Sequence, residues 1–584
     1  MSNLTKSKTD QTQGAASHFL LTQTNRGEVT TLLDLARRQY EGNPDGLALT
    51  LINAGSEAPT SITTREFFDG AGRYAQALRE VGVAPRDLVI LVMQHGDALL
   101  YAFWGAMMLG AIPSIFPFLS DKLDPQMYCE RVQALVAHSG ARAVIASEEF
   151  LDILTNLLSG VEVIGAARLK PGAGSPHFDP GVIGADIAFL QHSSGTTGLQ
   201  KGVALSHASV LNQLASYGQA IRLSADDVIV SWLPLYHDMG LIAGFIMPVA
   251  QGIPLVLMSP FQWVRDPRIL LRAIHDYHGT LCWLPNFAYN FMATRIRDRE
   301  IEGVSLGSLR AFVNCSEPMQ AESHRLFAKR FAAYGLREDA LTTSYAMAEN
   351  TFAVTQGGMD GPVTVDVISR AKLAEAHRAE GVEGEELSAE MLSCGRAIPR
   401  CEIRIVDDGR KALPERHVGE VAVRSDSMLS SYYKRDDLTA QVMFDGWYLT
   451  GDLGYLANGE LYITGRKKDL IIVGGKNIYP QDLEAIANEV PGVHPGRVVA
   501  FGVPDERLGT EAVVIVVEAE TDDEDARSAI GREVRMRVAQ QTETAVSNVL
   551  LVDAKWLYKT SSGKIARGAN REKYLEEMGR SRQA

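Results

Sequence analysis

The chain has 584 residues, which exceeds the roughly 250 to 300 residues that one hydrophobic core usually spans, so we expect at least two domains. The formal net charge of −14 argues against a protein whose main task is to coat nucleic acid, because phosphate binding relies on an excess of lysine and arginine. Small molecules or protein partners are expected instead.

The N-terminal stretch 1–17 is polar and lacks the apolar core of a secretory signal, so we predict a disordered tail. The cysteines lack the paired close spacing of a zinc or redox site, which fits a reduced, cytoplasmic setting. They are Cys129, Cys282, Cys315, Cys394 and Cys401.

The first four hundred or so residues alternate short apolar runs with segments of helical periodicity. Helices are predicted over 64–81 and 267–275. The apolar runs are rich in β-branched residues, as is typical of strands buried on both faces. They lie at 88–93, 143–146, 228–231 and 254–258. The alternation predicts a large N-terminal α/β domain of doubly wound, largely parallel sheets.

Residues 98–119 contain no charged side chain and are long enough to raise the question of a membrane span. Gly110, Pro113 and Pro117 interrupt the stretch, so we expect a buried helix followed by a buried strand. Residues 241–258 are interpreted in the same way. No transmembrane segment is predicted.

The pattern of apolar residues along the sequence changes near residue 402. Runs at 402–406 and 419–424 predict short strands of a small antiparallel subdomain. The last hundred or so residues again mix strand and helix, which predicts a small α+β domain. The charged, turn-like segment 465–469 marks the join, so the predicted domains are 18–467 and 468–584.

The strongest local signal is a loop between an apolar strand at 187–190 and a candidate helix from Ser206. It reads Ser193-Ser194-Gly195-Thr196-Thr197-Gly198-Leu199-Gln200-Lys201-Gly202. Its glycines let the backbone approach phosphate oxygens, its hydroxyls donate hydrogen bonds, and Lys201 adds charge. Gln200 stands where the nucleotide-triphosphatase loop needs its second glycine. We predict a different polyphosphate-binding loop, the alternative being a flexible turn without a ligand.

With this loop, further blocks in order along the chain resemble the adenylate-forming superfamily of acyl-CoA synthetases, peptide-synthetase adenylation domains and luciferases. The blocks are Trp232-Leu233-Pro234-Leu235-Tyr236-His237-Asp238, Tyr345-Ala346-Met347-Ala348-Glu349, Tyr448-Leu449-Thr450-Gly451-Asp452, Gly465-Arg466-Lys467-Lys468-Asp469 and Lys559-Thr560-Ser561-Ser562-Gly563-Lys564. The resemblance implies ATP-dependent conversion of a carboxylic acid to acyl-AMP with release of pyrophosphate, and then acyl transfer to a thiol.

The resemblance also implies how the nucleotide is held. Glu349 is the expected magnesium ligand, since a hard carboxylate oxygen suits a metal that bridges phosphates. Tyr345 is expected to lie along adenine, Ser316 to contact the adenosine, and Asp452 with Arg466 to bind the ribose. Without the resemblance, Glu349 is a surface charge and Asp452 a turn residue.

Three further residues take roles from the same resemblance. Lys564 is expected to carry adenylation, because its charge bridges the carboxylate, the α-phosphate and the leaving pyrophosphate. Lys468 matches the hinge at which a mobile C-terminal domain turns. His237 stands at the acyl-gate position and is expected to orient the substrate, the alternative being a core or solvated histidine.

Segments 285–289 and 475–484 resemble the fatty acyl-AMP ligase branch, which loads acyl chains onto carrier proteins. An insertion that marks this branch fits within 363–380. Segments 502–505 and 509–511 look more like coenzyme A ligases. The apolar residues 283–289 line an acyl tunnel or are plain core.

We therefore expect a fatty or similarly apolar acid to be activated with ATP and magnesium and delivered to the phosphopantetheine of an acyl carrier protein. The alternatives are an acyl- or aryl-coenzyme A ligase and a non-catalytic module that binds an acyl adenylate.

Overall fold

The computed structural model describes residues 29–53, 58–118, 125–169, 175–192, 201–384, 386–473, 476–505, 510–542, 544–560 and 563–583. The predicted tail, 1–17, and the predicted phosphate-binding residues 193–198 lie outside this part of the chain. The five cysteines lie inside it and are free thiols.

One seven-stranded sheet gathers the segments on which most of the predicted site stands. In spatial order it contains β13 (Leu341–Thr343), β12 (Ala311–Asn314), β11 (Leu281–Leu284), β9 (Ile229–Ser231), β10 (Leu255–Met258), β1 (Leu47–Ile52) and β2 (Thr60–Thr63). All neighbours are parallel except β1 and β2. The segments that follow the parallel strands therefore meet at one edge, where ligands of such sheets bind.

A second seven-stranded sheet carries the predicted phosphate loop. Its order is β20 (Ser431–Tyr432), β8 (Gly202–Ser206), β7 (Ile187–His192), β4 (Ile112–Ile115), β3 (Leu88–Val92), β5 (Ala143–Ala146) and β6 (Glu162–Gly165). The strands from β7 to β6 are parallel, whereas β8 and β20 are antiparallel additions. The largest apolar cluster of the molecule draws residues from both sheets and from α3 (Thr64–Glu80) and α4 (Asp97–Met108).

The helix predicted after the loop is present, and a strand that was not predicted precedes it. Strand β8 lies between them, and α7 (His207–Ala220) begins one residue later than predicted, with Ser206 as its N-cap. Val203, Ala204 and Leu205 are fully buried, so this short apolar run extends the sheet before the helix begins.

The uncharged stretches form helix followed by strand, as predicted. Residues 98–119 contain most of α4, followed by β4, and residues 241–258 contain most of the π-helix η2 (Met239–Ile246), then α8 (Met247–Gln251) and β10. Every helix within the described ranges is too short or too polar to span a membrane.

The remaining α-helices of the first 442 residues cover these sheets, except α13, which packs against β15 and β25. They are α2 (Leu32–Gly42), α5 (Pro125–Ser139), α6 (Glu148–Leu157), α9 (Pro260–Arg265), α10 (Arg268–Asp276), α11 (Asn286–Arg295), α12 (Ala321–Phe331), α13 (Arg370–Ala376) and α14 (Asp436–Val442). The predicted helices at 64–81 and 267–275 correspond to α3 and α10.

An antiparallel sheet follows the two large ones, as predicted. It contains β18 (Cys401–Val406), β19 (Gly419–Ser425), β22 (Trp447–Ala457), β21 (Met443–Phe444) and β23 (Glu460–Arg466). Three small pairs complete this region: β14 (Thr355–Gln356) with β17 (Arg396–Ala397), β15 (Val365–Ser369) with β16 (Ser388–Leu392), and β24 (Ile471–Val473) with β25 (Lys476–Ile478).

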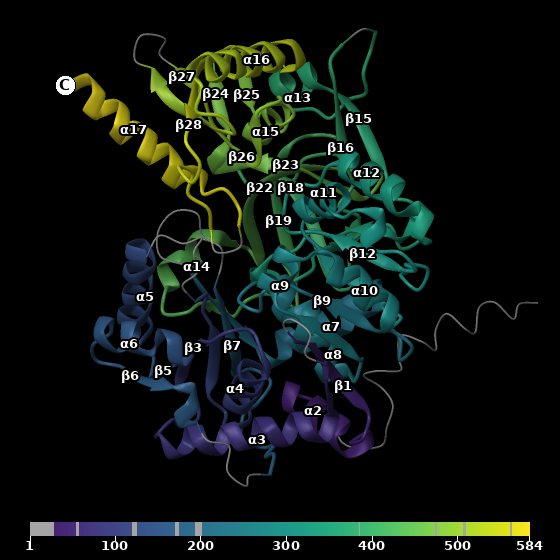
Figure 1. Ribbon diagram of the computed structural model, residues 1–584, viewed down its shortest axis with the longest axis vertical. Coiled ribbons are helices and arrows are strands. Elements are labelled where there is room, and N and C mark those ends of the chain that lie inside the picture. Colours follow the sequence, from purple (N-terminus) through teal and green to yellow (C-terminus); the bar gives the residue numbers. More distant parts are fainter. Residues whose placement is uncertain are drawn as a thin grey trace, which may run out of the picture.

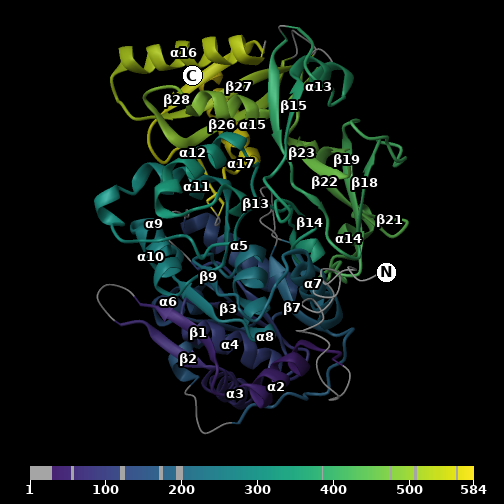
Figure 2. The ribbon, with the colours of Figure 1, turned by 90° about the vertical axis from the view of Figure 1, so that its right-hand side faces the viewer.

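The C-terminal part has its own sheet and apolar clusters. Strands β26 (Val493–Asp505), β27 (Thr510–Ala519) and β28 (Val546–Val552) pack with α15 (Pro480–Asn488), α16 (Glu524–Thr542) and α17 (Arg567–Gln583). Figures 1 and 2 show α15 and α16 at one end of the molecule and α2 and α3 at the other. The mixed α/β fold class is confirmed, and the boundary at 467/468 stays a prediction.

Candidate active site

An aspartate is held between a tyrosine and an arginine at the carboxyl edge of the first sheet. Tyr345 follows β13, and its hydroxyl donates to Oδ2 of Asp452 at 2.6 Å. Arg466 pairs with Asp452 across β22 and β23, and its Nε lies 3.1 Å from Oδ1. Burial and the Asp452 charge raise the pKa of Tyr345 well above its ordinary value, so the hydroxyl remains a donor. Each carboxylate oxygen keeps a lone pair for a further donor, such as a sugar hydroxyl.

Glu349 lies in the short helix η6 (Ala348–Asn350), and a tyrosine orients its carboxylate. The Tyr432 hydroxyl donates to Oε1 of Glu349 at 2.8 Å and lies 3.0 Å from the Tyr448 hydroxyl. Lys201, the cation of the predicted phosphate loop, places Nζ 4.4 Å from the centre of the Tyr432 ring. Tyr432 thus joins the loop cation to the acidic side chain.

The C-terminal part inserts Lys564 at the edge of the first sheet. Its Nζ donates to the backbone carbonyl of Ser316, which follows β12 and has a φ of 69°. Two hydrogen bonds close the turn that carries the lysine, from Thr560 N to the Lys564 carbonyl at 2.7 Å and from Lys564 N to the Thr560 hydroxyl at 3.1 Å. Residues 248 positions apart in sequence are therefore in direct contact.

Acidic side chains face Lys564 from two loops. Burial lowers the pKa of Lys564, while Glu317 and Asp238 oppose this effect and the Arg466 charge adds to it. Burial would raise the pKa of Asp238, yet attraction to His237 and Lys564 outweighs it and holds that pKa below its usual range. His237 places Nδ1 2.6 Å from Oδ1 of Asp238, and the two side chains are only 14% and 9% exposed.

The geometry brings the described members of the predicted set together in one region of the molecule. They are Lys201, His237, Ser316, Tyr345, Glu349, Asp452, Arg466, Lys468 and Lys564. Tyr432, Asp238 and Glu317 were not predicted. Asp238 ends a recognised block, which was a usable signal, whereas Tyr432 has no motif around it.

The comparison with protein families decides the class of the molecule: the family described as AMP-binding enzyme matches residues 36–433. The chain belongs to the AMP-binding enzyme family.

Individual relatives cover nearly all of this AMP-binding enzyme. A putative acyl-CoA synthetase of Caulobacter vibrioides is 30% identical over 94% of this chain and 95% of its own length. The medium-chain-fatty-acid–[acyl-carrier-protein] ligase JamA of Moorena producens is 29% identical over 94% and 96%. A structure from studies of fatty acyl-adenylate ligases of E. coli and L. pneumophila superposes with a TM-score of 0.86, at 26% identity over 95% of this chain and 98% of that one.

The family match makes the protein a ligase of the adenylate-forming class, which uses ATP, and favours an enzyme over the non-catalytic alternative.

Several cationic side chains of this AMP-binding enzyme lie close together in the region of the predicted site. Lys468 lies in η7 (Lys467–Asp469), where burial lowers its pKa, the charges of Arg466 and Lys201 add to the effect, and Asp469 opposes it. Such mutual repulsion is relieved when a polyanion binds among the cations.

The residues present suit a magnesium ion that is shared with a nucleotide. Among the residues placed by the structure there is no cluster of three or more histidine, cysteine, aspartate or glutamate side chains for a metal. Magnesium often takes one or two carboxylates and completes its coordination with phosphates and water. Oε1 of Glu349 accepts from Tyr432, which leaves Oε2 for such an ion.

Proposed function

We propose that the protein activates a fatty or similarly apolar carboxylic acid with ATP and magnesium, and then transfers the acyl group to the phosphopantetheine thiol of an acyl carrier protein. The observation that carries this proposal is the contact of Lys564 with the Ser316 carbonyl, beside the Tyr345–Asp452–Arg466 group. A cation from the C-terminal part thereby lies next to a polar group suited to adenosine.

The two half-reactions follow from these positions. An oxygen of the substrate carboxylate attacks the α-phosphorus, the bond to the bridging oxygen breaks, and pyrophosphate leaves. Lys564 exchanges the Ser316 carbonyl for the developing charge on the phosphoryl oxygens, and Asp452 holds the ribose. Glu349 would hold a magnesium ion, which would offset phosphate charge. In the second step the thiol sulfur attacks the acyl carbon, and the bond to AMP breaks.

An aromatic wall beside His237 supports an apolar substrate. Trp232, at the start of the block that contains His237, stacks on Trp263 of α9 with ring centres 3.6 Å apart. Phe287 of α11 packs 6.1 Å from Trp263 and is 41% exposed. The three residues come after β9, β10 and β11, at the carboxyl edge of the same sheet where Ser316 and Tyr345 come after β12 and β13. Trp232 and Trp263 are buried and Phe287 is the exposed member, so an acyl chain leaving the nucleotide would meet the Phe287 ring.

Contacts of the predicted insertion support a carrier protein as the acceptor. Within 363–380, Arg370 of α13 bonds Asp482 of α15 at 3.0 Å, Glu375 pairs with Lys476 at 2.6 Å, and His377 meets Asn477 at 3.0 Å. These contacts restrain the C-terminal part, whose rotation coenzyme A ligases of the resembled superfamily need. The acceptor named for the relative JamA is also an acyl carrier protein.

The test measures products by mass spectrometry with ATP, a panel of acids of graded length, and either a holo carrier protein or coenzyme A. We expect acid-dependent pyrophosphate release, accumulation of acyl-AMP when coenzyme A is the thiol, and acyl-carrier product when the carrier is present. Release of no pyrophosphate with any acid would contradict the adenylation step.

Coenzyme A is the second candidate acceptor. Residues 502–505 favour it by resemblance, and the Caulobacter relative is named as a putative acyl-CoA synthetase. Rapid formation of acyl-CoA in the same assay selects this alternative and leaves the adenylation proposal intact.

A further inference from the structure

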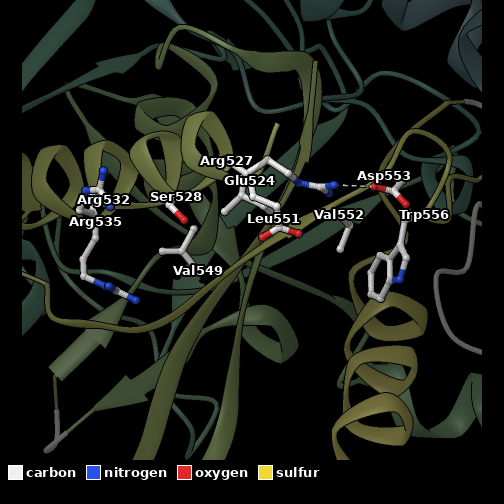
Figure 3. Close-up of a pocket in the computed structure, with 11 residues that line it drawn as sticks. Glu524, Arg527, Ser528, Arg532, Arg535, Val549, Leu551, Val552, Asp553 and Trp556 are labelled. Atoms are coloured by element: carbon white, nitrogen blue, oxygen red, sulfur yellow. Dashed lines mark hydrogen bonds and ion pairs between the residues drawn. The ribbon is translucent and has the colours of Figure 1, made fainter. Parts of the chain in front are cut away.

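A groove of about 640 Å³ runs between α16 and the edge strand β28 (Figure 3), and none of its lining residues belongs to the predicted adenylation site. Its helix side presents Arg527, Ser528, Arg532 and Arg535, which recur at spacings of one helical face. Its floor is the apolar pair Val549 and Leu551 from β28. Glu524 and Asp553 also line the groove, which therefore has an apolar base and a rim of three arginines and two carboxylates.

The cations of this groove are only partly neutralised. Arg527 pairs with Asp553 at 2.8 Å, and Figure 3 shows this pair at one end, with Arg532 and Arg535 at the other. Within the described ranges, neither Arg532 nor Arg535 has an ion-pair partner, whereas Arg537 on the same helix pairs with Glu533 at 2.6 Å. In a chain of net charge −14, two such arginines beside an apolar floor are suited to an acidic partner.

The groove is joined to the catalytic turn by the chain itself. Its wall continues from β28 through Asp553 to Trp556, and the turn closed between Thr560 and Lys564 follows four residues later. Trp556 is anchored on α17 by Glu577, whose carboxylate accepts from the indole at 3.2 Å, and by Lys573, whose Nζ lies 4.1 Å from the ring centre. A partner seated in the groove thus touches the segment that presents Lys564.

We propose that this groove docks an acidic face of the acyl carrier protein, an inference that rests on the proposed function. Arginine is suited to this role because its planar fork binds carboxylates bidentately and is weakly hydrated. Apolar side chains of the carrier cover Val549 and Leu551, while its carboxylates meet Arg532 and Arg535. Docking brings the phosphopantetheine arm to the part of the chain that moves between the two half-reactions.

The test is the double charge reversal Arg532→Glu with Arg535→Glu. We expect acid-dependent pyrophosphate release within about twofold of the native enzyme, because neither residue contacts the cleft. The KM for holo carrier protein in acyl transfer is expected to rise tenfold or more with kcat little changed. Transfer to free pantetheine, which has no protein surface, is expected to stay the same.

The matched control is Arg168→Glu with Arg299→Glu, which reverses two exposed arginines outside the groove and is expected to leave the carrier KM unchanged. A carrier variant with acidic residues changed to arginine is expected to restore a low KM to the reversed enzyme. An unchanged carrier KM in the double variant overturns the docking inference, as does equal slowing with pantetheine. A native enzyme that forms acyl-CoA and never acyl-carrier product refutes the carrier proposal itself.

Discussion

The proposed role of Lys564 in adenylation needs its positive charge, whereas burial disfavours that charge. Burial lowers its pKa, so the protonated fraction falls at a lower pH than for a lysine in water. We expect kcat/KM for ATP in pyrophosphate release to fall as pH rises through this pKa. Lys564→Arg is expected to be slower but to lose that alkaline decline, because arginine stays charged. The same decline in the arginine variant would assign it to another group.

Replacing Lys564 is expected to slow the first half-reaction much more than the second. Lys564→Ala removes the cation from the phosphoryl group, and loss of such a contact typically slows reaction by about 10² to 10³. We expect this loss in acyl-AMP formation, measured by pyrophosphate release. Transfer from supplied acyl-AMP to the thiol should remain largely intact, and equal loss in both would refute the division of labour.

Tyr432 positions Glu349 through one hydrogen bond of 2.8 Å. Loss of a group that orients a metal ligand typically costs about 10-fold to 100-fold in metal affinity or activity. Tyr432→Phe is therefore expected to lower adenylation about tenfold at limiting magnesium and to recover part of it at high magnesium. A magnesium titration checks this, with Tyr433→Phe as the control. An identical magnesium response in the two variants would contradict the role of Tyr432.

At the scale of elements, Arg567 joins four segments of the C-terminal part. At the start of α17 it pairs with Glu484 of α15 at 2.8 Å and Asp469 of η7 at 2.7 Å, and it donates to the Ala500 carbonyl of β26 at 2.9 Å. Burial raises the pKa of Glu484, and the nearby Arg567 offsets part of that shift.

Arg567→Met leaves these partly buried carboxylates without their cation. Breaking a buried pair in this way typically costs about 3–5 kcal/mol of unfolding free energy, although partial exposure here favours the lower end. Urea unfolding measures the loss, with Arg532→Met on the surface of α16 as a control. Without Arg567, the pKa of Glu484 in the folded state should rise further. Protonation of Glu484 then stabilises the folded variant, so the loss of unfolding free energy should shrink as pH falls toward 5. A deficit that grows in acid would contradict this account.

Elements with strong periodicity were predictable from the sequence. The helices at 64–81 and 267–275 and the strands of the antiparallel sheet appear near their predicted places. Strand β8 was missed because its five residues begin with a glycine and end in an N-cap serine, so the signal of the following helix obscured it. Short segments between a loop and a capped helix carry too little pattern to separate strand from turn.

At the scale of the whole molecule, the motif blocks could be recognised in the sequence but the contacts between them could not. The blocks that contain Glu349, Asp452 and Lys564 are recognisable one by one. Tyr432 is 83 residues from Glu349, and no spacing rule links them. Such pairs depend on how the sheets and the C-terminal part pack, which local pattern does not encode.

Contacts between the predicted insertion and the C-terminal part are expected to affect which thiol is used. Arg370→Ala with Lys476→Ala removes two bridging ion pairs, of 3.0 and 2.6 Å, and frees the C-terminal part to turn. We expect acyl-CoA formation to increase several-fold with adenylation unchanged, measured by mass spectrometry. Arg325→Ala breaks a pair with Glu390 of β16 in the same hairpin without touching the C-terminal part, and serves as the control. No gain of acyl-CoA over this control would contradict the restraint.

The two-residue strand β20 links the segment after the predicted phosphate loop to the carboxylate of Glu349. It is hydrogen-bonded to β8, which continues directly from Lys201, and Tyr432 within it holds Glu349, whose carbonyl also accepts from Leu429 N at 2.7 Å. Any displacement of β8 would therefore be passed through β20 to that carboxylate. The strand after the loop and the acidic side chain thus form one mechanical unit, although they lie far apart along the chain.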